Sequence, residues 1–177
     1  RGLGDVYKRQ LNFRAIAHEF DVPTDFAPSL HAEASELVDR FADVRIDARD
    51  IPFVTIDPAG SKDLDQAVYV EQRAGGGYRV RYAIADVAAF VDSDSDVHEE
   101  SLQRGQTIYL PDDPARLHPE EVSEGSASLL PNVDRPAVLW TFDLDGEGEV
   151  ESAHVERALV HSVARLDYEG VHASLAD

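Results

Sequence analysis

A change in the spacing of apolar residues near residue 51 constrains the fold more than any other feature of this sequence. Before it, apolar residues recur at helical intervals, whereas in residues 78–85 Tyr, Val and Ile alternate with Arg and Ala. Such alternation is typical of a strand whose two faces meet different surroundings. Short apolar runs over 53–56 and 66–71 predict two further strands. Because the second run ends just before the glycines at 75–77, we predict a β-hairpin with a glycine turn.

A second hairpin is predicted toward the carboxyl end of the chain. Residues 137–144 form an apolar run, and the Asp-Gly-Glu-Gly sequence at 145–148 is typical of a turn. The segment 150–166 then has two interpretations, because helix propensity alone would allow a helix over 153–163. We favour a strand. Within residues 106–136, Pro111, Pro114, Pro119 and Pro131 exclude long regular elements and predict an ordered loop or crossing segment.

Helices are predicted on both sides of the strands. Helical spacing of apolar residues indicates helices over 11–20 and 30–42. A third, of about two turns, is expected to begin with Asp96 as its cap and to stop at Gly105. A last helix is expected to begin with Asp167 as its cap. The sequence therefore predicts an α+β fold with a mostly antiparallel twisted sheet and flanking helices.

The chain divides into three parts by composition. The first ten residues carry three of the 16 basic side chains and resemble a non-native leader, so residues 1–10 are left out of the fold prediction. Residues 11–48 form a helical segment, and 49–177 form the strand-rich part. A chain of 177 residues suffices for one domain with a core. Because it has no Met and ends inside a predicted helix, we expect a piece of a longer protein.

Charge and composition exclude several classes of function. There are 35 acidic and 16 basic residues, a formal charge of −19, so bulk positive charge does not drive binding to a polyanion. The absence of Cys excludes disulfides and thiolate metal sites. No apolar run approaches the roughly 18 residues that span a bilayer, and no signal peptide is visible. We therefore expect a cytoplasmic protein with no membrane partner.

The sequence between the first two strands carries the strongest chemical signal. Asp57, Asp63 and Asp65 lie within nine residues, and Pro58 and Gly60 bend the chain between them. Clustered carboxylates repel one another unless a cation neutralises them, and hard oxygen donors select Mg²⁺ or Mn²⁺. The spacing does not match a calcium-binding EF-hand loop. The alternative, which spacing alone leaves open, is an acidic turn whose side chains cap their own backbone.

These residues also carry a family resemblance. The sequence TIDPAGSKDLDQAVYV, followed by YRVRYAIADVAAFV, is similar to the signature of the RNB catalytic domain of the ribonuclease II and ribonuclease R family. The likeness extends in order over about residues 50–172, through the sequences GQTIYLPDD, LHPEEVSEG, LLPNVDRPAVLW and RLDYEGV. Because the family's domain is about twice as long, the resemblance implies that 49–177 is the amino-terminal portion of an incomplete RNB domain.

The resemblance implies an activity and assigns roles to the acidic residues. Members of the family hydrolyse single-stranded RNA processively from its 3′ end with Mg²⁺ and release nucleoside 5′-monophosphates. Asp57 and Asp63 match the first two motif aspartates, which hold or orient the metal. Asp65 matches the aspartate on which catalysis depends most. Gln66 replaces the fourth aspartate; a neutral amide is a weaker ligand for Mg²⁺ than a carboxylate, but its carbonyl oxygen can still bind the metal or position a metal-bound water.

Two tyrosines match family residues that contact RNA. Tyr109 matches the aromatic residue that stacks on the 3′-terminal nucleotide, a role that any base can satisfy through its π-face. Tyr168 matches a second RNA-contacting aromatic residue. Without the resemblance, ordinary packing would be the preferred role for Tyr109.

Other polar and aromatic residues receive structural roles. We expect Asp86 to end a strand and cap the turn at 87–91 rather than bind metal. Trp140 is expected in the core. For Arg135, a loop salt bridge and an RNA contact remain equally open. None of the seven His residues shows the spacing of a metal site.

Three functions remain in competition. The first is a Mg²⁺-dependent exoribonuclease or the front half of its catalytic domain. The second, suggested by Gln66, is a degenerate RNB-like module that binds RNA or metal without cutting. The third, suggested by the net charge, is an acidic interaction domain with no nucleic-acid role.

Overall fold

The computed structural model describes residues 13–176, so the leader predicted at residues 1–10 lies outside it. In this part of the chain the helices are α1 (Arg14–Glu19), α2 (Pro28–Glu36), α3 (Asp96–Arg104) and α4 (Tyr168–Ala176). The short helical turns are η1 (Ala42–Val44), η2 (Val87–Ala89) and η3 (Glu121–Ser126). The strands are β1 (Ile46–Ile56), β2 (Gln66–Gln72), β3 (Tyr78–Ala85), β4 (Asp134–Leu144) and β5 (Val150–Leu166). None of the described helices is long and apolar enough to cross a membrane.

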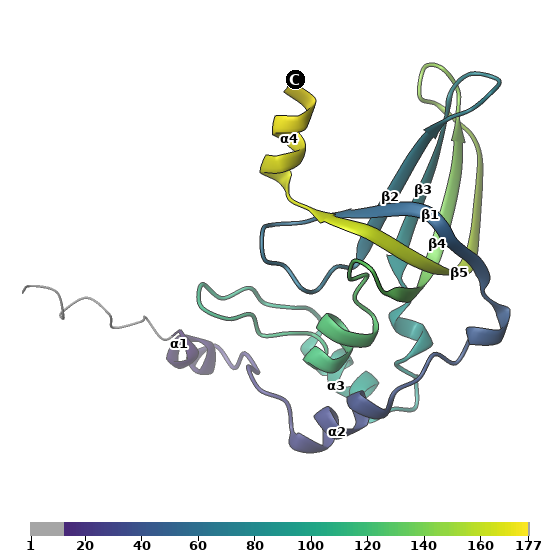
Figure 1. Ribbon diagram of the computed structural model, residues 1–177. Helices are drawn as coiled ribbons and strands as arrows, with labels where there is room; N and C mark the ends of the chain where they lie inside the picture. Colours follow the sequence, from purple (N-terminus) through teal and green to yellow (C-terminus); the bar gives the residue numbers. More distant parts are fainter. Residues whose placement is uncertain (1–12, 177) are drawn as a thin grey trace, which may run out of the picture.

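The five described strands form one sheet that closes on itself, in the order β1-β2-β3-β4-β5 (Figure 1). Neighbouring strands run antiparallel except for β1 and β5, which run parallel from Ile46 opposite Ala158 to Ile56 opposite Leu166. The predicted α+β class and mostly antiparallel sheet are confirmed. The parallel pair that closes the sheet has no local signature in the sequence, because its two strands are separated by most of the chain.

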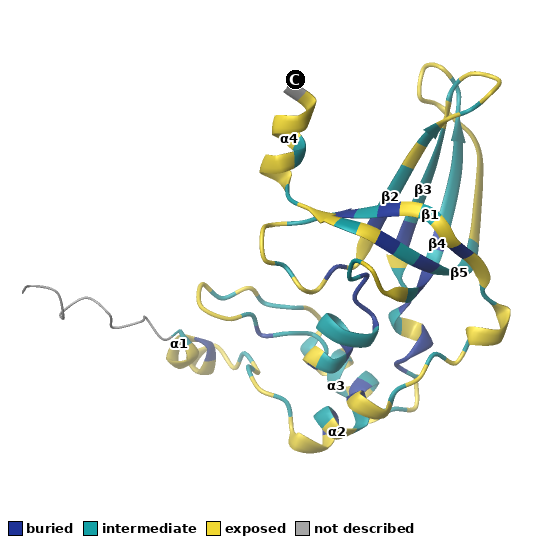
Figure 2. Ribbon diagram, viewed as in Figure 1, coloured by how far each residue is buried: buried dark blue, intermediate teal, exposed yellow. Residues whose placement is uncertain are grey.

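Both predicted hairpins are confirmed. Strands β2 and β3 pair from Gln66 opposite Ile84 to Gln72 opposite Tyr78. Gly77 in the turn has φ +75°, and a Cβ there would lie 2.1 Å from the carbonyl oxygen of Leu144. Only glycine fits this position. Strand β5 spans all of residues 150–166, as favoured over a helix, and Figure 2 shows that the tips of both hairpins are exposed.

Small side chains fill the inside of the closed sheet. The buried cluster contains Phe53, Leu129, Leu139, Val160 and the five alanines Ala48, Ala67, Ala83, Ala137 and Ala158. Because alternate residues of a strand face opposite sides, Leu139 points into this cluster and Trp140 points away from it. Trp140 is half-buried and stacks on Phe142 with ring centroids 5.8 Å apart. The prediction that Trp140 lies in the core is therefore wrong.

A second core lies beneath the sheet, where α2, α3, η2 and η3 pack together (Figure 1). Its buried members are Leu30, Ala34, Ala89, Phe90, Val91, Val97, Val122 and Ala127. α2 ends earlier than predicted, because Leu37 is extended and the Arg40 N–H donates to the carbonyl of Ala89 (3.1 Å). The chain is thereby turned toward η2 instead of continuing the helix.

The helix boundaries test three predicted caps. The cap of α3 is Ser95 rather than Asp96, because the Ser95 Oγ accepts a hydrogen bond from the His98 N–H (3.1 Å). A serine before the first helical residue satisfies an otherwise unpaired amide as well as an aspartate would. Gly105 ends α3 with φ 73°, as predicted. The Asp167 cap is also confirmed, since its Oδ1 accepts from the Gly170 N–H (2.7 Å).

A buried group of ion pairs ties the helical segment to the closed sheet. This Arg45 cluster consists of Asp39, Arg45, Asp86 and Arg157. Arg45 is only 2% exposed and donates to Asp39 (2.6 and 2.9 Å) and to Asp86 (2.9 Å). Arg157 donates to the same Asp86 oxygen (2.9 Å). Asp86 follows the end of β3 and precedes η2, as predicted, but its side chain does not cap the turn, because two arginines occupy the carboxylate and only the backbone carbonyl accepts a bond from the turn.

Candidate functional site

The three motif aspartates lie on residues 57–65, which join β1 to β2 and are called the aspartate loop below. The loop starts where the Asp57 N–H donates to the carbonyl of Leu166, at the end of β5 (3.1 Å). It bends as predicted, because the Ser61 N–H donates to the carbonyl of Pro58 (3.1 Å) and Gly60 has φ +94°. The guanidinium of Arg165 donates to the Ser61 carbonyl (2.9 Å). The parallel closure of the sheet therefore fixes the first half of the loop.

The second half of the loop is anchored from two other directions. Leu64 is fully buried, its N–H donates to the Ser128 hydroxyl (3.0 Å), and its carbonyl accepts from the Leu129 N–H (2.7 Å). The Asp65 carbonyl accepts from the Ala85 N–H at the end of β3 (2.8 Å). A buried leucine between two exposed aspartates leaves the Asp63 and Asp65 side chains at the surface.

Burial and neighbouring carboxylates raise the pKa of two loop residues, Asp57 and Asp65. Burial raises the pKa of Asp57 above its ordinary value, and the charges of Asp65 and Asp63 raise it further. Burial also raises the pKa of Asp65, and the charge of Asp63 adds to this rise. Within residues 13–176 none of the three has an ion-pair partner, and Lys62 pairs with Glu124 instead (3.6 Å). The ionised loop therefore gains from a bound cation.

The loop does not hold a ready-made metal cage. No group of three or more His, Asp or Glu side chains in the described chain is arranged closely enough to hold a metal ion. The mutual repulsion of unneutralised carboxylates gives a physical reason for this spread. Gln66 is exposed, and its side-chain oxygen accepts a hydrogen bond from the hydroxyl of Tyr82 on β3. As a set of hard oxygen donors the four residues fit Mg²⁺ or Mn²⁺.

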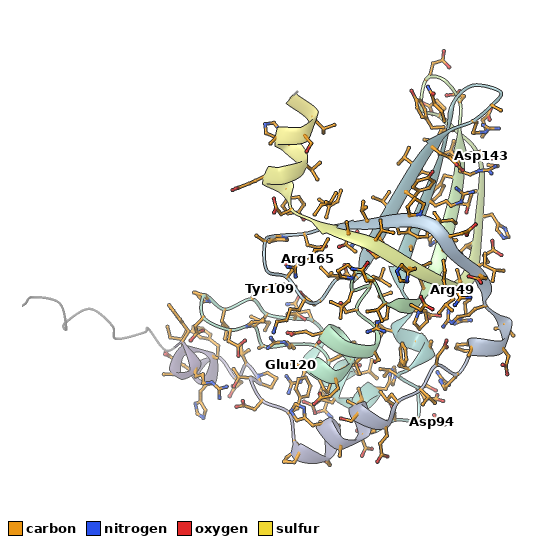
Figure 3. The ribbon with its side chains drawn as sticks, in the orientation of Figure 1. Arg49, Asp94, Tyr109, Glu120, Asp143 and Arg165 are labelled. Atoms are coloured by element: carbon orange, nitrogen blue, oxygen red, sulfur yellow. The ribbon has the colours of Figure 1, made fainter. Side chains whose placement is uncertain are left out.

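A cavity of about 240 Å³ joins the aspartates to Tyr109. Its lining includes Asp63, Asp65, Tyr109, His118 and Ser128. Tyr109 is 75% exposed, yet partial burial raises the pKa of its hydroxyl and the charges of Asp63 and Asp65 raise it further. Figure 3 shows Tyr109 beside the loop, below Arg165. The structure thus brings Tyr109 close to Asp63 and Asp65, although Tyr109 follows Asp65 by 44 positions in the sequence.

The other predicted residues lie elsewhere. Tyr168 is the first residue of α4, is 60% exposed, and is not among the described residues that line the cavity. Arg135 donates to the carbonyls of Ser128 (2.9 Å) and Asp134 (3.2 Å) and forms no carboxylate pair in the described chain. The Arg135 side chain therefore stabilises Ser128, whose hydroxyl is hydrogen-bonded to the backbone of the aspartate loop.

Sequence reasoning missed three residues near the loop. Ser128 and Arg165 bind loop backbone, and His118 lines the cavity, where burial lowers the pKa of its imidazole. No pattern marks them, because the residues they meet are far away in the sequence. The sequences that carry the family resemblance include His118 and Arg165 but not Ser128, and the hydrogen bonds become visible only in the fold.

Comparisons with known proteins match this chain to one family. The model of the RNB domain matches residues 45–177. Ribonuclease R of Vibrio cholerae serotype O1 is 34% identical over 160 residues, which are 90% of this chain and 19% of that protein. The chain thus spans about a fifth of that relative's length.

Solved structures show the same fold. Mycoplasma genitalium RNase R, in complex with ribose methylated single-stranded RNA, matches with a TM-score of 0.87 and 29% identity. The match covers 93% of this chain and 26% of that one. Yeast Ssd1, described as a pseudonuclease, shares the fold alone, with a TM-score of 0.70 and 18% identity over 79% of this chain and 18% of its own. The predicted family is confirmed: this chain belongs to the RNB domain family, and the bacterial relatives it matches are ribonucleases.

Proposed function

We propose that this chain is the amino-terminal part of the catalytic domain of a 3′-to-5′ exoribonuclease that degrades single-stranded RNA to nucleoside 5′-monophosphates. The observation that carries the proposal is one cavity lined by Asp63, Asp65 and the exposed ring of Tyr109. The charges of both aspartates also raise the pKa of Asp57. The RNA bound to the similar Mycoplasma genitalium enzyme supports the substrate class. A reducing cytoplasm suits the cysteine-free chain.

The metal of the proposed reaction is Mg²⁺, with Mn²⁺ as a substitute. Asp57, Asp63 and Asp65 would hold it through carboxylate oxygens, and Gln66 would contribute its amide oxygen. When bound, the ion supplies Lewis-acid polarisation of the scissile phosphate. The raised pKa values of Asp57 and Asp65 support this assignment, because both carboxylates gain from a neighbouring positive charge.

The chain's own residues bind and orient the RNA end. The Tyr109 ring offers an exposed stacking surface for the last base, worth about 1–3 kcal/mol per stacked base in other proteins. Because Tyr109 shares the cavity with Asp63 and Asp65, a stacked terminal nucleotide has its sugar and phosphate directed toward the carboxylates.

A second candidate function is an RNB-like module that binds RNA without cutting it. The observation that favours it is the hydrogen bond from the Tyr82 hydroxyl to Gln66 Oε1, which occupies the amide oxygen at the place of the fourth motif aspartate. A catalytically inactive protein on the same fold is physically reasonable, because function depends on the site rather than on the fold.

An assay on the full-length protein that contains these residues distinguishes the two. A 5′-labelled single-stranded oligoribonucleotide with Mg²⁺ should shorten progressively from its 3′ end, and a 3′-labelled one should release labelled mononucleotide at once. Asp65→Asn should abolish both, whereas Asp94→Asn, on the far side of the molecule in Figure 3, should not. Binding without products would favour the inactive module, and neither binding nor products would contradict both.

A further inference from the structure

Ser128 is the buried polar side chain that touches the aspartate loop most directly. It is 1% exposed and lies between η3 and β4. Its hydroxyl donates to the carbonyl of Lys62 (2.6 Å) and accepts from the N–H of Leu64 (3.0 Å). These two backbone groups belong to the peptide bonds on either side of Asp63. One hydroxyl therefore holds the backbone of Asp63 from both sides.

Ser128 is itself held in place by its neighbours. Its carbonyl accepts from the Arg135 Nε (2.9 Å) and from the Leu130 N–H (2.8 Å). The next residue, Leu129, is fully buried and donates its N–H to the Leu64 carbonyl (2.7 Å). The short segment thus lies alongside the loop and meets it through three hydrogen bonds. A rigid support of this kind is what the repelling carboxylates of the loop require.

Removal of the hydroxyl would leave the loop backbone without these partners. The Lys62 carbonyl and the Leu64 N–H would face a buried methyl group, and unsatisfied buried polar groups are costly. The loop gains by turning these groups toward water, which shifts Asp63 relative to Asp65. Some residues hydrogen-bond to a metal ligand without binding the metal themselves. Their mutation typically lowers the affinity for the metal by 10–100-fold.

We propose that Ser128 is a positioning residue for the metal site, acting through the backbone of Asp63. This inference rests on the proposed function, because it requires that the loop carboxylates bind a divalent cation. Ser128 does not supply a ligand. Its hydroxyl sets the separation between the Asp63 and Asp65 carboxylates, and hence the affinity of the site for the cation.

The test measures Mn²⁺ binding to the full 177-residue chain by the loss of the free-ion signal in electron paramagnetic resonance, with thermal unfolding recorded without metal. Ser128→Ala should weaken Mn²⁺ binding about tenfold. Ser128→Thr keeps the hydroxyl at the wall of a cavity and should stay within about threefold of the unchanged protein. Ser162→Ala is the matched control, because Ser162 is also buried, at 2%, but its hydroxyl contacts only strand carbonyls.

Each outcome decides a different question. If Ser128→Ala folds and binds Mn²⁺ as well as the unchanged protein, or if Ser162→Ala weakens binding equally, the positioning role is wrong while the proposed metal site stands. If Ser128→Ala does not fold, Ser128→Cys takes its place, since a thiol is only a weak donor and acceptor, and the same loss is expected. If the unchanged chain binds no Mn²⁺, the metal site itself is wrong, and the positioning role is overturned with it.

Discussion

The pKa values of acidic side chains are shifted in opposite directions in the Arg45 cluster and in the aspartate loop. In the cluster, Asp39 and Asp86 share a buried arginine, and hydrogen bonds from Arg45 lower the pKa of Asp39. In the loop, burial and mutual repulsion raise the pKa of Asp57 and Asp65. The basic residues at the loop do not pair with its carboxylates, since Lys62 pairs with Glu124 and Arg165 donates to the backbone carbonyl of Ser61.

The difference separates acidic side chains that are paired with arginine inside the fold from acidic side chains that, within residues 13–176, have no ion-pair partner. A chain with 35 acidic and 16 basic residues cannot pair every carboxylate, so the placement of its arginines matters. The fold places Arg45 where an unpaired acid would destabilise the junction between helices and sheet. It places no such partner, within residues 13–176, at the loop that matches the family motif. The uncompensated charge therefore lies where the proposed cation would bind.

The largest expected effect comes from removal of the buried arginine. Arg45→Met leaves Asp39 and Asp86 with one fewer cation in a nearly dry site, so the free energy of unfolding should fall by about 3–5 kcal/mol. Urea unfolding of the variant measures this loss. Arg49→Met, which breaks exposed pairs with Asp47 and Asp134, is the control and should cost much less. Equal losses would show that the cluster is not the special junction described above.

The second effect concerns RNA rather than stability. Tyr109→Ala should weaken binding of a single-stranded oligoribonucleotide by about 1–3 kcal/mol, because the stacking surface is lost. Tyr109→Phe keeps the ring and should bind nearly as well. Since the side chain is 75% exposed, thermal unfolding should hardly change in either variant. Fluorescence anisotropy at fixed salt gives the affinity, and an unchanged value for Tyr109→Ala would remove Tyr109 from the site.

The third effect is a pH dependence of the stability that the Arg45 cluster contributes. Because the pKa of Asp39 is lowered from 3.8 by Arg45, its contribution to stability is fully present above pH 3.8. That contribution is lost as the pH falls through the lowered folded-state pKa. Urea unfolding below pH 3.8 should therefore show a steeper loss in the unchanged protein than in Arg45→Met, which lacks the pair. Parallel curves would mean that Asp39 gains nothing from Arg45.

The smallest expected effect is an increase in the free energy of unfolding. Without divalent metal, Asp65→Asn removes one repelling charge from the loop and should raise the free energy of unfolding by roughly 0.5 kcal/mol. The opposite sign is expected for Asp39→Asn, which removes a paired charge from the cluster. Urea unfolding in the presence of a chelator compares the two. If both variants are destabilised alike, the contrast between the two regions fails.

Much of the fold was predictable because its signals are local. Alternation over residues 78–85 and the turn at 145–148 indicated both hairpins, and the spacing of Asp57, Asp63 and Asp65 indicated the loop. The error at Trp140 has the same origin, because an apolar run does not tell which face of a strand points inward. Periodicity alone gives the strand but not the side.

Long-range contacts were not predictable. Closure of the sheet joins Ile46 to Ala158, and the Ser128 hydroxyl meets Leu64 across 64 residues. The early end of α2 also depends on a distant partner, the carbonyl of Ala89. The motif in the sequence predicts the chemistry of the site, but the hydrogen bonds that support the loop arise only from tertiary packing.

The proposed function requires that the carboxylates of Asp57, Asp63 and Asp65 bind one or more divalent cations. A crystal of the chain grown with Mn²⁺ and measured for anomalous scattering tests it most directly. We expect a strong anomalous peak within ligand distance of at least two of these carboxylates, and we expect it to disappear in Asp65→Asn. A peak that lies elsewhere, or no peak at saturating Mn²⁺, would contradict it.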